Sequence, residues 1–357
     1  MTAPDTLPYT RIAVIGSGTW GTALASVLAR AGRDVVVWGR RVEVVDAIGQ
    51  GTHPALEGIA LPHGIKATAS LETALDGAEA VLMVTPSQTL RDMAAQMRPH
   101  LGKAVPVALC AKGIERGTGL LLSEVVQQEL PDHPVGAISG PTFARETALG
   151  YPTAATVAFP FTFDDRLNPN ASPAARMAVT LGGPEFRPYV SDDLVGVEVG
   201  GAVKNVIAIA CGMMSGAGFA ENTRAALITR GMDEMKTLAE ALGGRRETVT
   251  GLAGAGDLTL TCSSETSRNM KLGKQLGAGI ARGECFDGLP VVVEGETNAV
   301  SVCDLAARVG VSMPICETVN AILHHGADLK QGFRDLWSAP IEGEPRTLEI
   351  MLAQPAS

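Results

Sequence analysis

The chain has few aromatic residues and no excess of positive charge. Aromatic side chains make up only 4% of its 357 residues, and 29 Lys and Arg stand against 38 Asp and Glu, for a formal net charge of −9. Single-strand nucleic-acid binders need aromatic stacking platforms, and phosphate-backbone binders need broad basic surfaces. We therefore expect no nucleic-acid partner. An anionic small ligand would need a local basic cluster in this acidic chain.

Long apolar runs and paired cysteines are also lacking. The N-terminal MTAPDTLPYT carries Asp5 and no cationic stretch before an apolar core, so it does not have the pattern of a signal peptide. The longest apolar candidate, residues 199–214, contains Lys204 and Asn205, and we expect no membrane span. The six cysteines form no C-x-x-C pair, which favours reduced cysteines in a cytoplasmic protein.

Metal-binding patterns are absent as well. The six histidines show no metal-ligand spacing with Cys or carboxylates, and His324 and His325 are expected on a helix surface. We therefore predict neither a metal site nor a nucleophilic triad. What is abundant is apolar residues, 46% of the chain against 19% charged, which excludes intrinsic disorder and leaves enough material for about two domains.

The two halves of the chain differ in pattern. In the first half, short apolar runs alternate with helix-length segments, which is typical of a parallel sheet covered on both faces; the runs are residues 11–16, 34–38, 80–85, 105–110 and 135–138. Residues 160–173 are polar, Pro-rich and aperiodic, and predict a surface loop. From about Ser191, Ala-, Gly- and Leu-rich helical spacing dominates. We expect domains at 1–190 (α/β) and 191–341 (helical), followed by a loosely held tail at 342–357.

A glycine-rich turn follows the first predicted strand. Residues 16–21 read G-S-G-T-W-G and lie directly before a helix predicted at 22–31. In this setting Gly16 permits the tight turn, Gly18 lets the backbone approach a pyrophosphate, and Gly21 lets helix and strand pack closely. The free N–H groups of the helix start favour phosphates. The motif predicts a Rossmann-type, doubly wound dinucleotide-binding domain; the alternative is a glycine turn that only connects two elements.

The end of the second predicted strand indicates which dinucleotide binds. NAD-specific sites usually place a carboxylate there for the ribose 2′-hydroxyl, whereas this chain has Arg40 and Arg41. Two guanidinium groups suit a 2′-phosphate, so NADP is favoured and NAD remains open. The alternative is that both arginines simply begin a solvated helix.

Lys204 is predicted to lie in an apolar helix. Residues 195–213 place an apolar seam on one face, and the neighbours of Lys204 on the other face, Val197, Gly200, Ala208 and Cys211, are small or apolar. We expect this helix to be buried on both sides, with open volume beside the Lys204 ammonium. A lysine so placed suits a proton donor facing a ligand; the alternative is an ion pair with a buried carboxylate.

Further polar clusters stand at strand ends and turns. Lys112 follows the run at 105–110, and Gly140, Thr142 and Ala144 follow the run at 135–138. Ligands bind at such carboxyl ends of parallel strands. Asp257 ends a glycine-rich turn, and the sequence Ser267, Arg268, Asn269 begins a predicted helix, which is a pattern for an anion site or for an ordinary helix cap. Asn205 and Glu198 share a side of the Lys204 helix.

Taken together, these segments resemble bacterial-type NAD(P)-dependent glycerol-3-phosphate dehydrogenases, from about Arg11 to about His325. The resemblance rests on the blocks GSGTWGTALA, CAKGIE, SGPTFARE, SDDLVGVEVGGAVKNVIAIACG, GLAGAGDLTLTCSS and SRNMKLG. It implies reversible hydride transfer between NAD(P)H and dihydroxyacetone phosphate, giving sn-glycerol 3-phosphate, the backbone precursor of glycerophospholipids.

The resemblance also implies roles for individual residues. Lys204 matches the family's acid/base. The residues that match substrate contacts are Lys112, Gly140, Thr142, Lys204, Asp257, Ser267, Arg268 and Asn269. The residues that match the dinucleotide site include the turn glycines. They are Gly16, Ser17, Gly18, Trp20, Gly21, Arg40, Arg41, Lys112, Ala144, Arg268, Val292 and Glu294. After Asn269 this chain has Met270 and Lys271, where two basic residues are common, so phosphate binding would depend more on Arg268.

Two other functions remain open at this point. One is a related two-domain dehydrogenase acting on a β-hydroxyacid, whose carboxylate substrate needs no phosphate pocket. The other is a dinucleotide-sensing module without catalysis, which would have no reason to bury Lys204. We also expect a homodimer, formed through the apolar, small-residue helices of the second domain.

Overall fold

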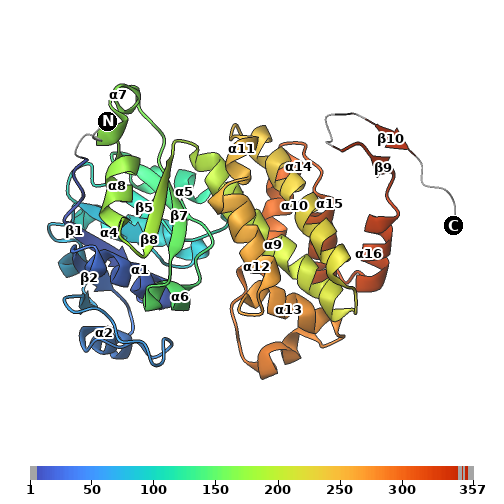
Figure 1. The fold of residues 1–357 in the computed structure, drawn as a ribbon, viewed down its shortest axis with the longest axis horizontal. Coiled ribbons are helices and arrows are strands. Elements are labelled where there is room, and N and C mark those ends of the chain that lie inside the picture. Colours follow the sequence, from blue (N-terminus) through green and yellow to red (C-terminus); the bar gives the residue numbers. More distant parts are fainter. Residues whose placement is uncertain (1–5, 345–347, 349, 353–357) are drawn as a thin grey trace.

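The computed structural model of the chain describes residues 6–344, 348 and 350–352. Figure 1 shows a sheet with its covering helices in the N-terminal part and a helical C-terminal part. The sheet has eight strands in the order β3-β2-β1-β4-β5-β6-β7-β8. These strands are β1 (Arg11–Ile15), β2 (Asp34–Trp38), β3 (Lys66–Thr68), β4 (Ala80–Met83), β5 (Val107–Leu109), β6 (Val135–Ser139), β7 (Thr153–Ala158) and β8 (Phe186–Ser191).

The first six strands have the order of a dinucleotide-binding fold. They pair in parallel, and the strand order reverses between β1 and β4, where a crevice for ligands forms at the carboxyl ends. All four residues of β4 and four of the five in β1 are buried, because helices cover both faces of the sheet. The predicted doubly wound domain is confirmed, and the five predicted strands match observed ones to within a few residues.

The edge at β7 and β8 departs from the prediction. β7 runs antiparallel to β6 and parallel to β8, so the sheet is mixed rather than wholly parallel. Neither strand was predicted, and neither was β3. Only Phe186 of β8 is buried, and the strand contains Pro188, which is tolerated at a sheet edge. Such half-exposed edge strands lack the continuous apolar run by which the central strands were found.

Short helices replace the surface loop predicted at 160–173. Thr162 caps α7 by accepting from the N–H of Asp165, whose carboxylate in turn accepts from the Thr162 N–H, and Ser172 caps α8 ahead of Pro173. The helices of this part are α1 (Thr19–Arg30), α2 (Val42–Gly49), α3 (Leu71–Leu75), α4 (Leu90–Met97), α5 (Leu122–Glu129), α6 (Ala144–Leu149), α7 (Phe163–Leu167) and α8 (Pro173–Leu181), with 3-10 turns η1 (Ser87–Thr89), η2 (Arg98–His100) and η3 (Pro169–Ala171).

The C-terminal part is built around one long helix, α9 (Leu194–Gly216). Its other helices are α10 (Glu221–Ala241), α11 (Arg246–Val249), α12 (Asp257–Ser263), α13 (Arg268–Gly277), α14 (Glu294–Arg308), α15 (Pro314–His324) and α16 (Leu329–Trp337), with a π-helical turn η4 (Leu252–Gly256) and a 3-10 segment η5 (Arg282–Gly288). By length and composition α9 could cross a membrane, but 94% of its most apolar stretch is buried inside the protein. The predicted burial of this helix on both sides is therefore confirmed.

Glycines let α13 pack directly against α9. A Cβ on Gly273 would overlap the carbonyl oxygen of Ile209, and one on Gly277 would overlap that of Met213. The two helix backbones are therefore in contact, and the start of α13 is held at a fixed position beside the middle of α9.

The end of the chain forms a small antiparallel pair within the described residues. β9 (Ile341–Glu342) pairs with β10 (Met351–Leu352), so the expected helical region ends on a strand residue, Ile341. The rest of the predicted tail, residues 345–347, 349 and 353–357, lies outside the described residues, as do residues 1–5.

Candidate functional site

Three charged side chains meet at the carboxyl edge of the sheet. The Lys204 ammonium donates to Asp257 Oδ1 at 2.6 Å and to Thr261 Oγ1 at 2.9 Å. The Lys112 ammonium donates to the other oxygen, Oδ2, at 2.5 Å and to the Gly140 carbonyl at 3.4 Å. Side-chain exposure is 8% for Lys204, 16% for Lys112 and 3% for Asp257. Two ammonium groups thus share one buried carboxylate, which leaves a net positive charge for an anion.

Four separate elements bring this cluster together. Lys112 follows β5, Gly140 follows β6, Lys204 is in the middle of α9, and Asp257 begins α12. The glycines of α9 allow this approach, because a Cβ on Gly200 would lie 2.8 Å from the Ala253 carbonyl oxygen and one on Gly201 would lie 3.2 Å from Lys112 Cγ. The expected open volume beside Lys204 is therefore wrong at these positions: the small residues admit neighbouring backbone and the Lys112 stem.

Burial sets the protonation of the cluster. Burial, together with the nearby Lys112 charge, lowers the pKa of Lys204 to about 8, against the opposing attraction of Asp257. Burial alone would raise the pKa of Asp257, but the charges of Lys112 and Lys204 hold it below its ordinary value. At neutral pH the carboxylate is ionised and Lys204 is mostly protonated. Lys204 thus carries an acidic proton close to working pH, as a general acid requires.

An amide network extends from the next residue of α9. The Asn205 side chain accepts from Asn269 Nδ2 at 2.8 Å and donates to Glu294 Oε2 at 3.2 Å, and Asn269 Oδ1 accepts from the Gly295 N–H at 2.9 Å. The network fixes α13 and α14 to α9. Glu198, on the same helix, does not join it: its carboxylate accepts from the N–H of Ser123 at 2.8 Å and from the Ser123 hydroxyl.

The start of α13 offers donors toward solvent. Ser267 is buried and caps the helix by accepting from the Met270 N–H, which confirms the predicted helix start. Arg268, the first helical residue, is exposed, and its guanidinium has no hydrogen bond within the part of the chain that the structure describes. A free guanidinium at a helix N-terminus suits a phosphate.

The glycine turn after β1 fits a dinucleotide. Gly16 has φ of +130°, and a Cβ there would lie 2.7 Å from the Val84 carbonyl oxygen of the neighbouring strand segment. A Cβ on Gly21 would overlap the Gly16 carbonyl oxygen, whereas Gly18 has open space around it. The start of α1 is thus closed on the protein side and open at Gly18, the position at which a pyrophosphate approaches.

The other predicted cofactor residues lie around the same edge or on the surface. Arg40 and Arg41 are exposed directly after β2. Ser17 is buried and Trp20 half-buried at the start of α1, while Thr142 and Ala144 are half-buried between β6 and α6. Val292 is exposed, and Glu294 begins α14 beside Asn205.

Sequence reasoning missed one member of the ion cluster. Thr261 is one turn after Asp257 on α12, and its hydroxyl accepts from Lys204. The spacing of four residues puts both side chains on one helix face, which was a readable signal once Asp257 was chosen. Among the described residues there is no group of three or more side chains that could hold a metal ion.

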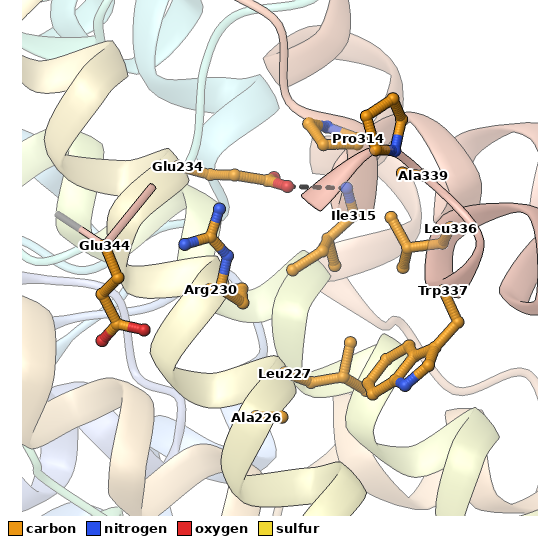
Figure 2. A pocket seen from close by; sticks show the side chains of 11 residues that line it. Ala226, Leu227, Arg230, Glu234, Pro314, Ile315, Leu336, Trp337, Ala339 and Glu344 are labelled. Atoms are coloured by element: carbon orange, nitrogen blue, oxygen red, sulfur yellow. Dashed lines mark hydrogen bonds between the residues drawn. The ribbon is translucent and has the colours of Figure 1, made fainter. Parts of the chain in front are cut away.

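A cavity in the helical part lies apart from this cluster. Figure 2 shows it between α10, α15 and α16, with Trp337 and Leu227 on one side and Arg230 and Glu234 on the other. The buried Glu234 carboxylate accepts from the Ile315 N–H at 2.6 Å, at the start of α15. None of the predicted site residues lines this cavity, so the charged cluster at the sheet edge remains the candidate site.

Comparison with known proteins identifies the family. The N-terminal domain described as "NAD-dependent glycerol-3-phosphate dehydrogenase N-terminus" matches residues 11–162, and the corresponding C-terminus matches residues 193–334. A glycerol-3-phosphate dehydrogenase [NAD(P)+] of Rhodospirillum rubrum is 46% identical over 336 residues, 93% of each chain. One from Parvibaculum lavamentivorans is 45% identical over 95% of this chain and 99% of its own.

A solved structure agrees with these relatives. The crystal structure of glycerol-3-phosphate dehydrogenase from Coxiella burnetii superposes with a TM-score of 0.84 at 38% identity, covering 92% of this chain and 99% of that one. The chain therefore belongs to the NAD(P)-dependent glycerol-3-phosphate dehydrogenase family.

Proposed function

We propose that Lys204 is the acid/base of a reversible hydride transfer between NAD(P)H and dihydroxyacetone phosphate, which yields sn-glycerol 3-phosphate. Family membership makes the chain an NAD(P)-dependent oxidoreductase acting on these substrates. The observation that supports the role of Lys204 is its buried ammonium, shared with Lys112 across Asp257 at the carboxyl edge of the sheet. The product is a precursor of glycerophospholipids, so the enzyme supplies their synthesis.

The residues at the β1 turn fit the dinucleotide. Bound NAD(P)H supplies the hydride. Gly16, Gly18 and Gly21 shape the turn, and the N–H groups at the start of α1 bind the pyrophosphate. Arg40 and Arg41 lie where a ribose 2′-phosphate would be recognised, so we propose that NADPH is preferred over NADH. The remaining proposed cofactor contacts are Ser17, Trp20, Lys112, Ala144, Arg268, Val292 and Glu294.

The substrate phosphate is assigned to the start of α13. Ser267, Arg268 and Asn269 combine a helix N-terminus, a free guanidinium and a fixed amide. Binding the phosphate there holds the three-carbon chain, so that its carbonyl is oriented toward Lys204. Gly140 and Thr142, beside Lys112, are the proposed contacts on the opposite side.

The charged cluster then performs the proton chemistry. As C2 of the ketone is reduced, negative charge develops on its oxygen, and the Lys204 ammonium stabilises this charge and donates the proton. Lys112 adds positive potential at the same place. Asp257 keeps both ammonium groups in position and keeps Lys204 protonated against its burial. In the reverse direction, neutral Lys204 accepts the hydroxyl proton of glycerol 3-phosphate.

An absorbance assay of the purified protein tests this function. We expect dihydroxyacetone phosphate to trigger oxidation of NADPH, faster than that of NADH at equal low concentration. A β-keto acid should not replace the phosphorylated ketone. Binding of NADPH without ketone-dependent oxidation would instead support a dinucleotide sensor, and equal use of a keto acid would support the related β-hydroxyacid dehydrogenases.

The domain roles, the location and the oligomer are also proposals. Residues 1–190 would bind the dinucleotide, 191–341 the substrate, and 342–357 would form a tail. All six cysteines are unpaired thiols, which fits the reducing cytoplasm.

Phe219 and Trp337, about half exposed on the helical part, favour a homodimer through that part. Light scattering that gives the mass of one chain would contradict the dimer.

A further inference from the structure

A buried histidine joins the glycine turn to the loop between α2 and β3 by a hydrogen bond. His53 lies between α2 and β3 and is only 4% exposed. Its Nδ1 accepts from the Ala55 N–H at 3.1 Å, so the ring hydrogen is on Nε2, which donates to the Ser17 carbonyl at 3.0 Å. Both ring nitrogens are therefore engaged with backbone groups, and one of these belongs to the dinucleotide turn.

The bond to Ser17 fixes the orientation of one peptide group in that turn. A trans peptide is planar, and its carbonyl points opposite to the N–H of the following residue. With the Ser17 carbonyl directed at His53, the Gly18 N–H points away from His53. This N–H has no acceptor among the described residues, and Gly18 borders open space. By holding this peptide group, His53 leaves the Gly18 N–H as a free donor at the position proposed for the pyrophosphate.

The segment that carries His53 is also bonded to α6, whose first residue, Ala144, is a proposed cofactor contact. The Arg145 guanidinium of α6 donates to the Glu57 carbonyl at 3.0 Å. Leu56 and Ile59 form a small buried cluster with Ala23 of α1 and Ala148 of α6, with Trp20 and Ala144 packed against it. Residues 53–59 therefore contact the starts of both α1 and α6.

We infer that His53 is a positioning residue for the dinucleotide: it holds the Ser17–Gly18 peptide so that the Gly18 N–H faces the pyrophosphate. The inference rests on the proposed dinucleotide site at residues 16–21. His53 does not take part in the proton chemistry, since its ring faces the turn and its partners are backbone groups. Its effect should appear in cofactor affinity and leave the chemical step unchanged.

Two conservative substitutions separate the two bonds of the ring. In His53→Asn the side-chain oxygen can still accept from the Ala55 N–H, as in an Asx turn, but the amide is too short to reach Ser17. In His53→Gln the longer amide places an N–H where imidazole Nε2 was. We expect H53N to raise the Kd and KM for NADPH about tenfold, equal to about 1.4 kcal/mol. H53Q should restore them to about the native value.

The measurements are NADPH fluorescence titration, steady-state kinetics and thermal melting of the apo protein. For H53N we expect an unchanged kcat at saturating NADPH and an unchanged KM for dihydroxyacetone phosphate. The control is His63→Asn, at an exposed histidine of the same connection, which should behave as the native enzyme. Native affinity in H53N, or equal losses in H53N and H53Q with lowered melting temperatures, would overturn the inference and leave His53 a structural residue.

Gly18→Val distinguishes failure of this inference from failure of the proposed site. Gly18 has an ordinary φ of −74° and open space around it, so the variant should fold, while its side chain would block the pyrophosphate. If G18V loses NADPH binding and H53N does not, the dinucleotide site stands and the role of His53 is refuted. If G18V binds NADPH normally, the proposed site itself is wrong, and the inference falls with it.

Discussion

Replacing Asp257 by Asn tests the electrostatic core of the site. Asp257 Oδ1 is 2.6 Å from Lys204 Nζ, and both groups are buried. The substitution keeps the shape and removes the negative charge, so that the two ammonium groups face each other uncompensated. A hydrogen bond to a charged group contributes about 1.5–3 kcal/mol. Since about 1.4 kcal/mol corresponds to one pH unit, the pKa of Lys204, about 8 in the native protein, should fall to about 6–7.

The consequence is a shift of the pH profile. Protonated Lys204 is needed for ketone reduction, so native kcat/KM should fall as pH rises through about 8. In D257N this fall should occur about one to two pH units lower, with reduction slowed about 2- to 10-fold at pH 7 by loss of the ammonium form alone. Any loss of direct substrate contact adds a pH-independent decrease.

The assay is kcat/KM for dihydroxyacetone phosphate at saturating NADPH across this pH range, because this constant reports the ionisation of the enzyme before the ketone binds. Oxidation of glycerol 3-phosphate serves as the internal control. It requires neutral Lys204, so its rise with pH should move in the same direction. A D257N profile with the native midpoint, reduced by the same factor at every pH, would refute the claim that Asp257 keeps Lys204 protonated.

Three further variants test the remaining parts of the account. Arg40→Ala combined with Arg41→Ala should raise the KM for NADPH and leave that for NADH nearly unchanged in parallel titrations; equal changes for both cofactors would argue against 2′-phosphate recognition. Arg268→Ala should chiefly raise the KM for dihydroxyacetone phosphate, and an unchanged KM would remove Arg268 from the phosphate site. Gly273→Ala should lower stability by about 1–3 kcal/mol in urea unfolding, as overpacking does, because its Cβ would overlap the Ile209 carbonyl oxygen; native stability would show that α9 and α13 can separate at little cost.

Local patterns in the sequence predicted the helices and strands that such patterns determine. Features that depend on contacts between distant segments were missed. The apolar runs of β1, β2 and β4 located the central sheet, and the helical spacing around Lys204 predicted the burial of α9. The half-exposed β8 escaped because it lacks such a run. Between Thr162 and Pro173, composition suggested a loop, although the Thr162 and Asp165 spacing of a capping box was present.

In the site, too, individual residues were predicted from local patterns, whereas the contacts between them were not. Lys204 and Asp257 were each selected from their own surroundings, but their pairing joins residues 53 positions apart and follows only from the tertiary structure. The same holds for the small residues around Lys204. Their small size predicted open volume beside the ammonium, but whether such space stays open or is filled by neighbouring backbone or the Lys112 stem is decided by how β5 and α9 are packed. His53 carried no signal, since its bonds go to backbone groups that any residue supplies.

The most direct test of the account is Lys204→Ala, measured for both turnover and cofactor binding. Loss of a positioned general acid typically slows a reaction about 10²- to 10⁴-fold. We therefore expect ketone-dependent NADPH oxidation to fall by this amount while the Kd for NADPH and the melting temperature stay near native values. Turnover close to native would show that another group delivers the proton, and joint loss of turnover, cofactor binding and stability would show that Lys204 only holds the helices together.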